Sequence, residues 1–112
     1  IGATYTIDRY HEQHAAPFSE GLTDTVIVGH NARLAEGFYG GFYGWPSMKL
    51  RPTGGFLGLP TSDKLADMRI VDMYRREGKK LAENWIFIDL PYWLKQQGLD
   101  IIERSQKIVA NK

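Results

Sequence analysis

The chain has 112 residues, 43% of them hydrophobic and 24% charged, with a formal net charge of +1. This is the composition of one folded domain over residues 1–112, and it excludes a disordered chain. There is no basic stripe and no apolar run of the ~20 residues that cross a membrane, so neither nucleic acid nor a membrane is expected as a partner.

The sequence contains no cysteine, which excludes disulfide bonds and thiolate chemistry. This is compatible with a reducing compartment, and we expect a cytoplasmic protein. The chain opens with Ile1 rather than methionine, so we expect a fragment or a processed product.

The N-terminal residues predict a helix. Thr6 is a typical cap, apolar residues follow it at helical spacing, and Gly21 is expected to end the helix. Pro17 makes the second half of this helix less regular. Residues 25–29 are a short apolar run, for which both a strand and a loop stay open.

Residues 31–43 alternate as a single strand. Within it, Gly40 and Gly41 predict a bulge or a sharp bend. The glycine-rich and proline-rich region that follows fits a strand with a long connection.

Residues 68–89 predict a β-hairpin that carries the main candidate site. Gly78 supplies the left-handed backbone of a tight turn, and a two-residue loop at Glu77-Gly78 sets Asp72 opposite Glu83. Because side chains alternate along a strand, one face is then shared by Met68, Ile70, Asp72, Tyr74, Leu81, Glu83, Trp85 and Phe87. This face is apolar and aromatic, with two acids near its middle.

Asp72 and Glu83 are the candidate catalytic residues. A carboxyl group among apolar side chains costs free energy unless it is protonated or paired, and such a group is a candidate for proton transfer. Glu83 is placed either to share a proton with Asp72 or to lie at the sheet edge in water. The alternative for Asp72 is a structural carboxylate paired with an arginine or a tyrosine. Asp89 is expected to cap a helix.

The C-terminal part predicts two helices. Pro91 marks the first turn of one that Gly98 ends, and the other runs from about residue 100 to 109. A helix, three or four antiparallel strands and then helices define an α+β fold.

The middle of the chain, roughly residues 30–100, resembles the SnoaL-like polyketide cyclase family of the nuclear transport factor 2-like superfamily. The motifs that carry the resemblance are Gly44-Trp45-Pro46-Ser47, Gly55-Phe56-Leu57-Gly58-Leu59-Pro60, Met68-Arg69-x-x-Asp72-x-Tyr74-Arg75, Gly78 through Glu83-Asn84-Trp85-x-x-x-Asp89, and Leu94-x-x-Gln97-Gly98. The resemblance implies a cone-shaped, curved antiparallel sheet with helices enclosing a deep apolar pocket, usually in a homodimer and without a metal or an organic cofactor. It also implies that Asp72 is the acid/base of an intramolecular aldol closure.

On this basis we expect an apolar or aromatic small molecule to be bound. The residues expected to line the substrate pocket are Tyr39, Tyr43, Trp45, Met68, Ile70, Tyr74, Trp85 and Phe87. The opposite hairpin face, with Val71, Met73, Ile86 and Ile88, is expected to form a homodimer interface.

Two departures from the family pattern favour another hypothesis. The family's histidine before the glycines at 54 and 55 is replaced by Arg51-Pro52-Thr53, and only one helix precedes the sheet, so the N-terminal part of the domain is expected to be shortened. A ligand-binding or dimerisation module without turnover therefore stays open.

A third hypothesis is an epoxide hydrolase-like set of Asp67, Arg69 and Asp72. Strand alternation places Asp67 and Arg69 on the opposite face from Asp72, which disfavours it. His11 and His14 have metal-compatible spacing on a helix, but no third ligand motif accompanies them, so we expect no metal site. His30 is expected in a loop.

Overall fold

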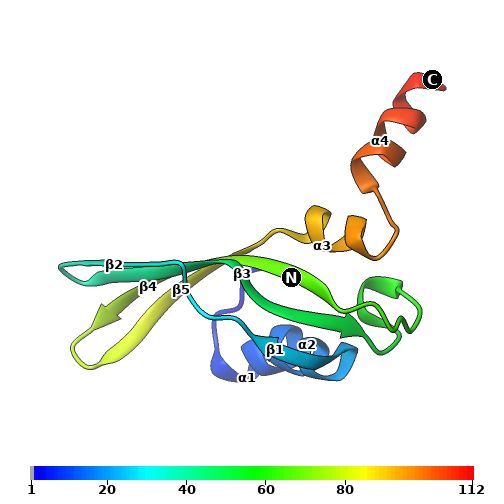
Figure 1. Cartoon of the computed structure of the whole chain (residues 1–112). Helices are drawn as coiled ribbons and strands as arrows, with labels where there is room; N and C mark the ends of the chain where they lie inside the picture. The colour runs from blue at the N-terminus through cyan, green and yellow to red at the C-terminus, as the bar shows by residue number, and fades with distance from the viewer. Residues whose placement is uncertain (1) are drawn as a thin grey trace.

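A curved, unclosed antiparallel sheet forms the molecule, with the N-terminal helices below it and the C-terminal helices above it at one end in this view (Figure 1). This is an α+β fold, as predicted. The computed structural model describes residues 2–112. In chain order the elements are α1 (Ile7–Tyr10), a π-helical turn (His11–Ala15), α2 (Ala16–Gly21), β1 (Leu22–Ile27), β2 (Ala32–Glu36), β3 (Tyr39–Pro52), a 3-10 turn (Phe56–Gly58), β4 (Ala66–Glu77), β5 (Lys80–Ile88), α3 (Leu90–Gln96) and α4 (Ile101–Ala110). No helix of the described chain is long and apolar enough to cross a membrane.

The long strand β3 organises the sheet. The strand order is β1-β3-β4-β5, and β2 also pairs with β3. Because β1 pairs with the C-terminal half of β3 and β2 with its N-terminal half, both lie along the same edge of that strand. Between Gly44 and Met48, three residues of β3 lie opposite a single residue of β4, and this bulge contains the cis peptide bond Trp45–Pro46.

The prediction of one strand over residues 31–43 is wrong, because a tight turn at Gly37-Phe38 divides this segment into β2 and β3. Gly37 has a φ of 58°, which favours glycine. The Gly40-Gly41 pair, at which the sequence predicts a bulge or a sharp bend, instead allows close packing between strands. A Cβ atom on Gly41 would lie 2.3 Å from Met73 Sδ and 2.6 Å from the carbonyl oxygen of Asp72, so glycine lets β3 and β4 pack here.

The predicted hairpin is present, but its register is wrong. The turn lies at Gly78-Lys79, and a bulge between Arg75 and Arg76 shifts the pairing again. Asp72 is therefore paired with Ile86 rather than with Glu83. The shift is by three residues, an odd number. Because side chains alternate between the two faces, every β5 side chain near Asp72 therefore lies on the opposite face from the predicted one.

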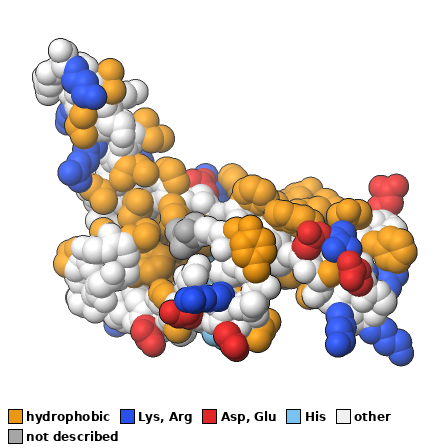
Figure 2. All heavy atoms as spheres, turned by 180° about the vertical axis from the view of Figure 1, so that it is seen from behind, with side chains coloured by type: hydrophobic (Ala, Val, Ile, Leu, Met, Phe, Trp, Pro, Cys, Tyr) orange, Lys and Arg blue, Asp and Glu red, His pale blue; other side chains and the backbone are white. Residues whose placement is uncertain are grey.

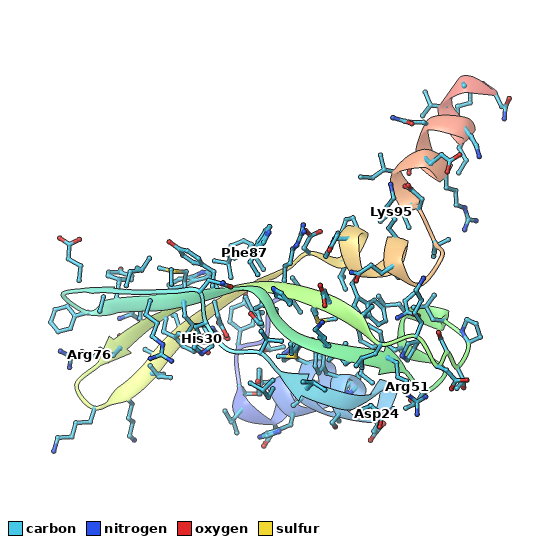
Figure 3. All side chains as sticks on the ribbon, viewed as in Figure 1. Asp24, His30, Arg51, Arg76, Phe87 and Lys95 are labelled. Atoms are coloured by element: carbon cyan, nitrogen blue, oxygen red, sulfur yellow. The ribbon has the colours of Figure 1, made fainter. Side chains whose placement is uncertain are left out.

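The sheet has a helix-covered face, on which α1 and α2 lie, and an outer face (Figures 1 and 3). Register and alternation place Phe42, Met68, Ile70, Asp72, Tyr74, Asn84, Ile86 and Ile88 on the helix-covered face. The outer face carries Tyr39, Tyr43, Val71, Met73, Glu83, Trp85 and Phe87. The predicted interface set is thus divided: Val71 and Met73 are on the outer face, whereas Ile86 and Ile88 are not.

A core between the sheet, α2 and α3 holds the two layers together. Its buried apolar residues are Leu22, Leu50, Ala66, Met68, Ile70, Trp93 and Leu94. The Trp93 indole donates a hydrogen bond to the carbonyl oxygen of Leu50 at 3.2 Å, so this large side chain is buried without an unsatisfied donor. Phe18 from α2 and Phe56 pack against this core.

The predicted N-terminal helix is present. The Thr6 hydroxyl caps it by accepting a hydrogen bond from the Arg9 backbone N–H at 3.2 Å, and the helix ends at Gly21 as expected. Pro17 lies in the first turn of α2, directly after the π-helical turn. Proline has no backbone N–H to donate, and Pro17 follows the place where the π-helical turn interrupts the regular α-helical pattern.

The two C-terminal helices are also confirmed, and they differ in how they are held. Asp89 caps α3, and the Gln96 side chain forms hydrogen bonds with both backbone groups of Asp67, so α3 is fixed to the edge of β4. Asp100 caps α4 and forms an ion pair with Lys95 at 2.9 Å. Beyond this point α4 stands away from the sheet, with Ile102, Ile108 and Val109 exposed (Figure 1).

Candidate functional site

Asp72 lies in the middle of the helix-covered face and is only 7% exposed. The Tyr74 hydroxyl donates a hydrogen bond to its Oδ2 at 2.8 Å, and the Asn84 amide donates one to its Oδ1. Phe42 on β3 and Ile86 on β5 are its cross-strand neighbours. The buried carboxylate is thus held by two neutral donors in otherwise apolar surroundings.

Of the two donors to Asp72, Tyr74 is the one with a shifted pKa. Its burial, followed by the hydrogen bond to Asp72 and the negative charge of that group, raises the pKa of Tyr74 to about 12. A smaller contribution comes from Tyr10, the last residue of α1. Tyr74 is therefore protonated at neutral pH and acts as a hydrogen-bond donor.

A cavity of about 350 Å³ lies between α2, the loop around residues 54–57 and the junction of β5 with α3. Most of its wall is apolar, with Gln13, His14 and Glu20 as the polar side chains. Its lining residues are Gln13, His14, Pro17, Phe18, Glu20, Gly21, Gly54, Gly55, Phe56, Leu57, Ile88 and Leu90. The volume lies in the range of small-molecule sites, ~300–1,000 Å³.

A larger open groove of about 990 Å³ runs between the N-terminal segment and β5, the edge strand of the sheet. Its lining includes Asn84, so the hydrogen-bond network of Asp72 reaches the groove through this amide. The groove and the cavity share four residues: Gln13, His14, Ile88 and Leu90. The two hollows therefore adjoin at the helical layer.

The structure separates the predicted site residues. Of the predicted pocket residues, only Tyr74 forms a hydrogen bond with Asp72. Met68 and Ile70 are buried in the core and line neither hollow. The predicted aromatic wall lies on the outer face of the sheet, away from Asp72. The strand register places Tyr39, Tyr43, Trp85 and Phe87 on that face. Trp45 lies there as well, against the guanidinium group of Arg69. Trp85 and Phe87 reach the groove around the β5 edge.

Our prediction that Asp72 and Trp85 line one cavity is therefore wrong, and the odd register shift is the reason. Glu83 does not face Asp72 either. It accepts a hydrogen bond from Arg75 on the outer face, and this contact is the main reason that the pKa of Arg75 is raised. Catalytic roles for Asp72 and Glu83 stay predictions.

The epoxide hydrolase-like set is not assembled. Arg69 is stacked between the rings of Tyr92 at 3.4 Å and Trp45 at 4.7 Å, and it forms an ion pair with Asp89 at 3.5 Å. Asp67 forms an ion pair with Lys49 at 3.2 Å. Neither residue forms a hydrogen bond or an ion pair with Asp72, in agreement with the alternation of the strand.

Sequence reasoning missed the helical residues of the site. Tyr10, His14 and Phe18 form a continuous aromatic row, with ring centroids 5.3 and 5.8 Å apart. Their helical spacing was a usable signal, because it places them on one face. Their partner Phe56 lies in a distant loop, 6.0 Å from Phe18, and no local pattern indicates that contact. His30 is in a loop, as expected (Figure 3). Its ring centroid lies 3.8 Å from that of Phe42.

The curved, unclosed antiparallel sheet with a few helices is a polyketide cyclase-like α+β fold. The structure is similar to the crystal structure of IdmH, a proposed polyketide cyclase from Streptomyces antibioticus, with a TM-score of 0.51 and 20% sequence identity. The match covers 68% of this chain and 52% of IdmH, so the chain spans about half the length of that protein. At this identity the similarity shows the fold alone. No protein-family model and no curated protein sequence matches the chain.

Proposed function

We propose that the chain binds an apolar or aromatic carbonyl compound on the helix-covered face and catalyses a polyketide cyclase-like aldol closure with Asp72 as acid/base. The observation that carries the proposal is the buried Asp72 carboxylate, held by Tyr74 and Asn84 in the middle of that face. The fold shared with a proposed polyketide cyclase supports it.

The chemistry is an isomerisation that needs no external reactant. Asp72 takes a proton from the carbon next to one carbonyl, the resulting enolate attacks a second carbonyl of the same molecule, and the proton returns to the alkoxide. A substrate in the groove would approach Asp72 beside Asn84, which lines the groove and contacts the carboxylate. Tyr74 stays protonated and holds the carboxylate in place.

The test follows proton exchange rather than the complete reaction. A small aromatic 1,5-diketone in D2O should exchange the protons next to its carbonyls faster in the presence of the protein, as measured by NMR. Asp72→Asn should lower this rate by ~10²–10⁴-fold, the usual contribution of general acid–base catalysis. Asp67→Asn, on the outer face, is the matched control and should leave the rate unchanged.

A ligand-binding module without turnover is the second candidate. It is favoured by the fact that Asp72 lines neither hollow and that both of its oxygens already accept hydrogen bonds. Tight binding of the diketone without exchange, and equal binding by Asp72→Asn, would select this candidate and exclude the enzyme.

We also propose a homodimer through the outer face. Apolar side chains form a continuous band along the sheet (Figure 2), and the exposed members are Leu34, Tyr39, Tyr43, Trp45, Trp85 and Phe87. The charges at its borders are paired within the chain, namely Arg69 with Asp89, Arg75 with Glu83, and Lys49 with Asp67. Such a face would not repel a second copy of itself.

The oligomeric state tests the interface. Phe87 is 62% exposed and lies on the side of the sheet opposite to α1 and α2 (Figure 3), so Phe87→Glu should dissociate the dimer without unfolding the chain. Sedimentation at micromolar concentration measures this. A wild-type monomer would refute the interface.

A further inference from the structure

We infer that His14 contacts the bound small molecule directly and forms a hydrogen bond with its hydroxyl or carbonyl group, while the apolar part of the molecule fills the cavity. The inference rests on the proposed small-molecule site and names the residue and the ligand chemistry that define it. The ligand class is a neutral aromatic compound that carries a hydroxyl or carbonyl group.

The position of His14 is the first argument. It lines both the cavity and the groove, at the place where they adjoin. A molecule with its apolar end in the cavity and its polar end toward the groove therefore passes this side chain. Of the three histidines in the chain, only His14 lines either hollow.

The second argument is the way the imidazole is held. Its ring lies between the rings of Tyr10 at 5.3 Å and Phe18 at 5.8 Å, so aromatic packing fixes its position. None of the side-chain hydrogen bonds within residues 2–112 involves this ring. A half-buried imidazole fixed in this way keeps its nitrogens for a ligand.

The third argument is the chemistry of the cavity wall. Apolar side chains dominate it, including Phe18, Phe56, Leu57, Ile88 and Leu90, which suits an aromatic body. Glu20 is the charged side chain among the lining residues, and its carboxylate disfavours an anionic ligand nearby. A neutral hydroxyl or carbonyl compound fits both properties.

The experiment uses 2-naphthol as the probe and naphthalene as the matched probe without a polar group. The C2 protons of His11, His14 and His30 are assigned by NMR with the three single His→Gln variants. Titration with 2-naphthol at neutral pH should shift the His14 signal saturably and leave the other two unmoved. His11 is the internal control, since it lies three residues away on the same helical segment and lines neither hollow.

The ratio of the two affinities is the second readout. His14→Gln could disturb the aromatic row, so His14→Phe, which keeps a ring between Tyr10 and Phe18, is measured beside it. We expect His14→Phe to lower the affinity for 2-naphthol about fivefold or more, which corresponds to the loss of one hydrogen bond. The affinity for naphthalene should change by less than about twofold. His11→Gln should change neither affinity.

The outcomes separate the inference from the proposed site. If both probes bind and shift the methyl signals of Ile88 while His14 and the affinity ratio stay unchanged, the site stands and the role of His14 is refuted. If neither probe binds at millimolar concentration, both are refuted.

Discussion

The Tyr74 hydroxyl donates a hydrogen bond to Asp72 Oδ2 at 2.8 Å, and the two residues are neighbours on the same face of one strand. A buried carboxylate that loses such a donor is left partly unsatisfied. Tyr74→Phe should therefore lower the free energy of unfolding by about 1–3 kcal/mol. Urea titration measures the change, and Tyr39→Phe on the outer face should have little effect.

The same contact makes stability depend on alkaline pH. Because the pKa of Tyr74 is raised to about 12 in the folded chain, its protonated form stabilises the fold below the ordinary tyrosine value near 10. This contribution is lost as the pH rises from about 10 through 12. Tyrosinate absorbance should show a late-titrating group that Tyr74→Phe removes. A titration curve of the variant identical to that of the wild type would contradict this prediction.

Gly40 and Gly41 give a matched pair for the packing of β3 on β4. Gly41→Ala should destabilise the fold by about 1–3 kcal/mol, because its Cβ would lie 2.6 Å from the Asp72 carbonyl oxygen and the backbone must move. Gly40→Ala, whose Cβ would lie 3.5 Å from the nearest atom, should change stability by less than about 1 kcal/mol. Equal unfolding midpoints for the two variants would show that this close approach is absent.

Arg69 should contribute more to stability than other charges on the outer face. It combines stacking on Tyr92 with an ion pair to Asp89, the residue that caps α3. Arg69→Met should cost about 1–3 kcal/mol. Lys49→Met, which breaks the more exposed pair with Asp67, should cost less than about 1 kcal/mol. Thermal unfolding of the two variants compares them directly.

Features set by neighbouring residues could be predicted from the sequence. The caps at Thr6 and Asp89 and the left-handed Gly78 depend on short-range geometry, and the structure contains all three. The pairing of Asp72 could not be predicted in the same way. It depends on whether the turn lies at Glu77-Gly78 or at Gly78-Lys79, and on the bulge at Arg75. The sequence pattern is similar for both turn positions, with or without the bulge.

The candidate site, too, could be predicted from the sequence only in part. The sequence predicts Asp72 as a candidate acid/base from its place on the hairpin and in a family motif, and this carboxyl group is buried in the structure. The cavity could not be predicted, because it combines α2 with Phe56 and Ile88, which are far apart in the chain. Contacts of this kind follow from how the layers pack and not from periodicity.

The separation of α4 from the rest of the molecule has a spectroscopic consequence. This helix has ten residues and is held at its start by the Asp100 cap and by Ile101, which packs against the core. Isolated helices of this length are marginal in water. Far-ultraviolet circular dichroism should therefore show a gradual early loss of helix on heating, before the main transition. Tryptophan fluorescence comes from Trp45, Trp85 and Trp93, none of which lies in α4, and it should change only in that main transition. The two signals together distinguish fraying of α4 from unfolding of the core.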